Sequence, residues 1–123
     1  MRKMLIAVYS KIITEELVRT FHKDYEVHTC SRGDDAFNLL QRIQPDVLII
    51  MLSLPGITGM EVLQQTKYTP PVIIALTNFL SDYIVQQSQA AGVGALIRLP
   101  CSMSRISYHL NTLLSQQHKL PSS

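Results

Sequence analysis

Five short apolar runs, rich in β-branched residues, recur along this chain and are separated by longer segments whose apolar residues fall at helical spacing. The runs span residues 4–8, 26–29, 47–52, 72–76 and 95–98. A short run bounded by turn residues predicts a strand, whereas apolar residues three or four positions apart predict a helix. The chain is therefore predicted to consist of five successive βα units.

The first, third and fourth runs are apolar on successive residues, without the alternation of a strand that has one face in water. Such strands belong to parallel sheets whose two faces are both covered by helices. With five units the sheet is expected to be open and doubly wound, because a closed barrel of this kind needs eight. The predicted fold class is α/β.

Capping residues mark where the helices begin. Thr58 and Glu61 have the spacing of a capping box and are expected to open the third helix, and Ser31 opens the second in a looser version of the same pattern. The last helix is predicted to begin near Ser102 or Ser104.

The length of the chain fits one domain, which we place at residues 1–116, with 117–123 as a linker or frayed tail. No long apolar run predicts a membrane span or a signal peptide, so a cytoplasmic location is expected. The formal net charge is only +2 and the basic residues are scattered, so this domain is expected to contact neither nucleic acid nor a membrane directly.

The two cysteines, Cys30 and Cys101, and the four histidines lack the spacing of a metal site. No histidine is predicted beside a nucleophile, so the chain is not expected to be an enzyme. Cys101 lies just ahead of a predicted helix, where a thiolate is favoured, and is expected to be at most modestly reactive. No metal or cofactor is predicted.

Ligands of open α/β sheets bind outside the carboxyl ends of the strands. Those ends deliver Tyr9 and Ser10 from the first strand, Met51 from the third, Thr77 from the fourth and Leu99 from the fifth. None of these side chains is charged at neutral pH. Any chemistry at this edge would therefore lack charged groups.

The segment 45–59, the strand at 71–77, the Ala91-Gly92 pair and the Leu99-Pro100 step resemble the receiver domain of bacterial response regulators, over nearly the whole chain. The resemblance implies a flavodoxin-like doubly wound five-stranded parallel sheet, in the order 2-1-3-4-5 with helices on both faces. It also implies a cis peptide bond between Leu99 and Pro100.

The same resemblance implies a degenerate phosphorylation site. In the family, an acidic pair binds a divalent cation where this chain has Tyr9 and Ser10, and the phosphorylated aspartate corresponds to Met51. Leu99 replaces the lysine of the fifth loop, and Thr77 keeps the hydroxyl that follows phosphorylation. Metal binding and phosphoryl transfer both depend on charge placement, so this chain is expected to be a pseudo-receiver.

A pseudo-receiver is expected to act independently of phosphorylation, as a regulatory or protein-interaction module in bacterial signalling or transcription control. The resemblance places partner contacts or homodimerisation on the fourth helix, fifth strand and fifth helix. On that face the chain offers Tyr83, Gln86, Gln87, Arg98, Arg105 and Tyr108. A C-terminal output domain outside this sequence is one expectation; a stand-alone adaptor or small-ligand sensor is the alternative.

A less favoured alternative is a flavodoxin-like protein that binds FMN in the loop after the first strand. The segment 8–15 carries hydroxyl residues there, but it lacks the glycine of a tight phosphate-binding turn and contains Ile12 and Ile13, which are stiff. The chain also has no tryptophan to stack on a flavin. These features favour the pseudo-receiver.

Overall fold

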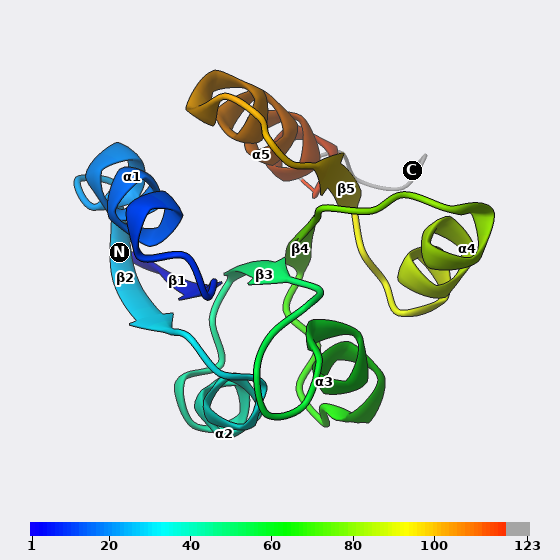
Figure 1. The fold of residues 1–123 in the computed structure, drawn as a ribbon. Coiled ribbons are helices and arrows are strands. Elements are labelled where there is room, and N and C mark those ends of the chain that lie inside the picture. Colours follow the sequence, from blue (N-terminus) through cyan, green and yellow to red (C-terminus); the bar gives the residue numbers. More distant parts are fainter. Residues whose placement is uncertain (118–123) are drawn as a thin grey trace, which may run out of the picture.

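The computed structural model describes residues 1–117 and contains one parallel sheet in the order β2-β1-β3-β4-β5 (Figure 1). Each strand is followed by a helix, as the sequence predicts. The strands are β1 (Arg2–Ala7), β2 (Tyr25–Cys30), β3 (Val47–Met51), β4 (Val72–Thr77) and β5 (Ala95–Arg98). The helices are α1 (Lys11–Phe21), α2 (Gly33–Ile43), α3 (Gly59–Gln65), α4 (Asp82–Ala90) and α5 (Met103–Gln117).

The sheet lies between two layers of helices. Figure 1 shows α1 and α5 on one face and α2, α3 and α4 on the other. This arrangement confirms the predicted doubly wound fold and its strand order. It also leaves β2 and β5 at the two edges of the sheet.

The centre of the core is formed by β1, β3 and β4, whose side chains are covered from both sides. Every residue of β3 and β4 is buried. Ile49 on β3 is in register with Ile6 on β1 and Ile74 on β4, and all three side chains are fully inaccessible. Burial on both faces explains why these runs lack polar alternation.

The third helix begins as predicted. The Thr58 hydroxyl accepts a hydrogen bond from the Glu61 amide at 3.1 Å, and the Glu61 carboxylate accepts one from the Thr58 amide, also at 3.1 Å. The reciprocal pair satisfies two backbone donors at the helix start. The capping box read from the sequence is thus confirmed.

The prediction for the start of α2 was wrong, because Arg32 rather than Ser31 is the N-cap and no side chain caps the helix. The cause is a tertiary contact. The Gly33 amide donates to the Pro55 carbonyl at 2.9 Å, and a Cβ at this glycine would lie 1.7 Å from the Ile57 carbonyl oxygen. The loop after β3 therefore fixes where α2 begins.

The last helix begins at Met103, between the two predicted starts, and continues through Gln117. The Gln117 side-chain amide donates to the Pro71 carbonyl at 2.8 Å. Gln117 therefore belongs to α5 rather than to a tail beginning at this residue. Residues 118–123, the rest of the predicted tail, lie outside the described part of the chain.

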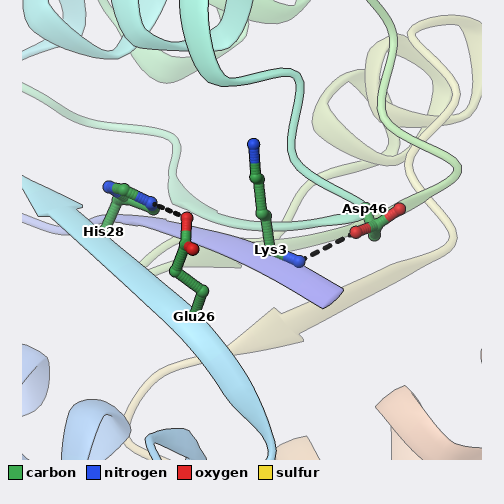
Figure 2. A network of polar contacts seen from close by, with 4 residues as sticks. All are labelled: Lys3, Glu26, His28 and Asp46. Atoms are coloured by element: carbon green, nitrogen blue, oxygen red, sulfur yellow. Dashed lines mark hydrogen bonds and ion pairs between the residues drawn. The ribbon is translucent and has the colours of Figure 1, made fainter. Parts of the chain in front are cut away.

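Figure 2 shows two polar contacts on the sheet, one between β1 and the residue before β3 and one within β2. The Lys3 amide donates to the Asp46 carboxylate at 2.8 Å, and His28 Nε2 lies 2.7 Å from Glu26 Oε2. The hydrogen bond from His28 lowers the pKa of Glu26 below its ordinary value.

Among residues 1–117, no helix combines the length and the apolar character needed to cross a membrane.

Candidate functional site

The residues assigned to a degenerate phosphorylation site all lie at the carboxyl edge of the sheet. Tyr9 and Ser10 connect β1 to α1, Met51 and Thr77 end β3 and β4, and Leu99 follows β5. Parallel strands place these ends along one edge. The structure therefore brings the predicted residues to one side of the molecule.

Met51 is part of the packed core rather than of an open crevice. Its side chain is 6% exposed. The start of α3 lies directly against the same strand end, because a Cβ on Gly59 would be 2.1 Å from the Met51 carbonyl oxygen. A thioether is only a weak acceptor, so this position offers neither a nucleophile nor a ligand for a hard cation.

Leu99 is half-buried, and its amide donates to the Thr77 carbonyl at 2.8 Å. The peptide bond between Leu99 and Pro100 is cis, as expected from the family resemblance. An aliphatic side chain supplies no positive charge at this point. The loop after β5 therefore has the predicted cis peptide bond, but the side chain at its start is apolar.

The Thr77 hydroxyl is used within its own loop. It donates to the Phe79 carbonyl at 2.9 Å and accepts from the Phe79 amide at 3.2 Å, and Thr77 as a whole is 6% exposed. This local turn satisfies the hydroxyl as both donor and acceptor. It also presents the Phe79 side chain to solvent, at 75% exposure.

The hydroxyls after β1 are likewise engaged within the chain. Ser10 is the N-cap of α1, and its side chain accepts from the Ile13 amide at 3.3 Å. The Thr14 hydroxyl donates to the Ser10 carbonyl at 2.9 Å. These bonds stabilise the start of α1, and they use the Ile13 amide and the Thr14 hydroxyl as donors within the chain.

The edge also lacks the charges of a metal or phosphoryl-transfer site. Within residues 1–117, no cluster of three or more His, Cys, Asp or Glu side chains is arranged to hold a metal ion. The carboxylate of Asp34, at the start of α2, is paired with Arg32 at 3.1 Å, and the hydrogen bond lowers the pKa of Asp34. Because this pair is half-exposed, its contribution to stability is small.

The surroundings of the two cysteines do not favour their thiolates, in keeping with the expectation that Cys101 is at most modestly reactive. Burial raises the pKa of the Cys101 thiol, although Arg105 acts in the opposite direction. Burial also raises the pKa of Cys30, to about 11. Neither thiol is a favourable nucleophile at neutral pH, because the thiolate is the reactive form.

The predicted interaction face is formed by α4, β5 and α5. Tyr83 and Tyr108 are each 66% exposed, and the other predicted contact residues are exposed except Gln87. Gln87 is half-buried, and its side-chain carbonyl accepts from the Gln64 amide group at 3.0 Å. The remaining members are Gln86, Arg98 and Arg105.

The sequence analysis missed the largest of the three described cavities. An open groove of about 930 Å³ lies between α1 and β2, and Tyr9 is the only predicted site residue that lines it. The sequence feature that marks this groove is the polar stripe on α1 that includes Lys11, Glu15 and Arg19. That stripe resembled an ordinary solvated helix face.

The chain matches the profile of the response regulator receiver domain over residues 7–111. It is 39% identical over 61 residues to the transcriptional regulatory protein DesR of Bacillus subtilis, covering 50% of this chain and 31% of that protein. It is 26% identical over 116 residues to the sensory transduction protein LytT of Oceanobacillus iheyensis, covering 89% of this chain and 47% of that protein.

The chain thus spans less than half the length of these curated relatives. Among solved structures, the chemotaxis response regulator CheY4 of Vibrio cholerae superposes with a TM-score of 0.81 at 26% identity, covering 92% of this chain and 98% of that one. The sequence match and the superposition cover nearly the whole described fold. The chain belongs to the response regulator receiver domain family.

Proposed function

We propose that this receiver domain works without aspartyl phosphorylation, as a regulatory protein-interaction module in bacterial signalling or transcription control. The observation that carries the proposal is the buried thioether of Met51 at the end of β3, where the family resemblance places the phosphorylated aspartate. Proteins similar to this chain include a transcriptional regulatory protein and a sensory transduction protein.

The physical support comes from the charges that phosphoryl transfer requires. Its catalysis depends almost entirely on positioning and on stabilising charge with a metal ion and cationic side chains. Tyr9, Ser10, Met51 and Leu99 supply none of these charges at the strand ends. The hydroxyl of Thr77, already bonded to Phe79, would have to leave two hydrogen bonds to follow a phosphoryl group.

The direct test is incubation with acetyl phosphate and magnesium, followed by intact-mass measurement. We expect no mass increase of one phosphoryl group, while a response regulator that retains the aspartate gains it under the same conditions. A stoichiometric, acid-stable and hydroxylamine-sensitive adduct on this chain would overturn the proposal.

We further propose that the face formed by α4, β5 and α5 makes the contacts, with a second copy of the chain or with a protein partner. Asp82, Arg98 and Arg105 are the main charges there, so contacts are expected to depend on tyrosine and glutamine packing, with little dependence on salt. A C-terminal output domain, joined after this sequence, fits the longer relatives.

Sedimentation velocity tests the homodimer form. We expect dimers without a phosphodonor, and monomers for Tyr83→Asp or Tyr108→Asp with an unchanged circular dichroism spectrum. Tyr9→Asp is the matched control, because Tyr9 is also 66% exposed but lies outside this face. Wild-type protein that stays monomeric at high concentration would refute the homodimer, as would an equal effect of Tyr9→Asp.

A further inference from the structure

The groove beside α1 lies at the β2 edge of the sheet, whereas β5 forms the opposite edge, and no residue of α4, β5 or α5 lines the groove. Figure 1 shows α1 next to β2, the edge strand, with no other strand beyond it. The groove has a volume of about 930 Å³ and is bounded by the outward side of α1 and the carboxyl end of β2. Its size is within the range of protein sites that bind ligands.

The outer edge of β2, which borders this groove at Thr29, offers free backbone hydrogen-bonding groups. The Val8 amide donates to the Cys30 carbonyl at 3.1 Å, so the backbone of Cys30 points toward β1. Successive residues of a strand point their amide and carbonyl groups to opposite sides, so Val27 and Thr29 point theirs outward. Within residues 1–117 no hydrogen bond is recorded on that outward side of either residue.

The side of α1 that faces the groove carries two cations and one carboxylate. Lys11, Arg19 and His22 line it together with a single carboxylate, Glu15. In the described part of the chain, neither Lys11 nor Arg19 makes an ion pair within 4.0 Å. These two cations are available to an acidic partner, although Glu15 lies one helical turn from each of them, and Val18 adds an apolar residue to the same lining.

We propose that an extended, acidic peptide segment of a partner protein binds here by adding a sixth strand next to β2. Its backbone pairs with the outward groups of Val27 and Thr29, and its carboxylates contact Lys11 and Arg19 across the groove. Strand addition to an exposed sheet edge is a recurring mode of peptide recognition, in which the backbone supplies affinity and alternate side chains supply specificity.

The carboxylates of an added strand are expected to point to the face of the sheet that α1 covers. Tyr25 packs edge-on against Phe21 of α1, with ring centroids 6.1 Å apart, so Thr29, four residues along β2, also faces α1. Glu26 and His28 face the other side and already bond to each other, as Figure 2 shows. The free cations therefore lie on the same side as Thr29.

The probe is a fluorescein-labelled peptide of alternating glutamate and valine, measured by fluorescence anisotropy. We expect saturable binding, loss of binding when lysine replaces glutamate, and amide NMR shifts centred on Val27 and Thr29. Two N-methylated peptides give the sharpest comparison, because a β-strand donates from alternate residues on each edge. Methylation of the alternate amides that face β2 is expected to abolish binding. Methylation of the alternate amides that face solvent is expected to leave binding intact.

The variant Lys11→Glu/Arg19→Glu is expected to weaken binding about tenfold, because two attractive contacts become repulsive. Lys67→Glu/Arg42→Glu is the matched control, since both residues are exposed and outside the groove. Circular dichroism of both variants checks that they fold.

Four results would overturn the proposal: no binding of the probe, equal effects of the two methylation patterns, equal effects of the two charge-reversal variants, or NMR shifts confined to other surfaces. A fifth result, concentration-dependent NMR changes at Val27 without peptide, would show that the occupant is a second copy of the chain and would also contradict the proposal.

Discussion

Substituting Met51 with a carboxylate tests whether the end of β3 can hold a charge. Met51 is 6% exposed, and burying a methionine side chain contributes about 1.5–3 kcal/mol to stability. Met51→Asn removes this contribution and buries an amide without a partner, which costs about 1–3 kcal/mol more. We expect Met51→Asn to lower the free energy of unfolding by roughly 3–5 kcal/mol.

Met51→Asp is expected to cost more than Met51→Asn at pH 7. Burial without a nearby cation raises the pKa of a carboxyl group, and each unit of that rise costs about 1.4 kcal/mol once the group is ionised. Because the folded-state pKa lies above the unfolded one, the extra cost is full above the folded pKa. It shrinks as the pH falls through the folded pKa and vanishes below the unfolded pKa, where the carboxyl is protonated in both states.

Urea denaturation followed by circular dichroism, at pH 7 and at pH 4, measures both effects. Met51→Leu is the control for shape and is expected to cost less than about 1.5 kcal/mol. If the Asp and Asn variants unfold at the same urea concentration at pH 7, the position is solvated or has a cationic partner, and the reasoning fails. Recovery of an aspartyl phosphate in Met51→Asp alone would contradict it independently.

Thr77→Val is expected to cost about 1–2 kcal/mol in urea denaturation, because two backbone groups of Phe79 lose their partner; Thr77→Ser should restore most of the loss. Glu26→Gln is expected to lower the melting temperature at neutral pH. Since the folded-state pKa of Glu26 is lowered by His28, the difference from wild type should vanish as the pH falls through that pKa, and a difference that persists at lower pH would contradict this assignment. Cys30, whose pKa is raised to about 11, should react with iodoacetamide at pH 8 more slowly than free cysteine, as peptide mapping can measure.

The order of the elements was predictable because its signals are local. The apolar run at 47–52 corresponds to β3, which ends at Met51, and the spacing of Thr58 and Glu61 marks the start of α3. Both signals can be read from residues that are neighbours in the sequence. An unbroken apolar run indicates a strand buried on both faces, and the spacing of the capping box indicates a helix start.

Distant parts of the chain override local signals at two points, of which only the start of α2 was predicted wrongly. Ser31 has a side chain that often caps helices. However, α2 begins at Gly33, because this residue contacts the loop after β3. Cys101 precedes a helix, but burial has the larger effect on its thiol. Neither effect has a signal in the residues next to it.

The composition of the candidate site could be read from the sequence, while its hydrogen bonding could not. Parallel strands place Met51 and Thr77 at one edge whatever the side chains are. The partner of the Thr77 hydroxyl depends on the path of the loop to Phe79. The groove beside α1 depends on β2 being the edge strand, so a polar helix face became informative only with the strand order.

The most direct test of phosphorylation independence is an amide NMR titration with beryllofluoride and magnesium, which together mimic an aspartyl phosphate. If the edge that carries Met51 and Thr77 lacks the charges for phosphoryl binding, the spectrum stays unchanged throughout the titration. Saturable shifts that cluster around Thr77 and require both beryllofluoride and magnesium would contradict this conclusion.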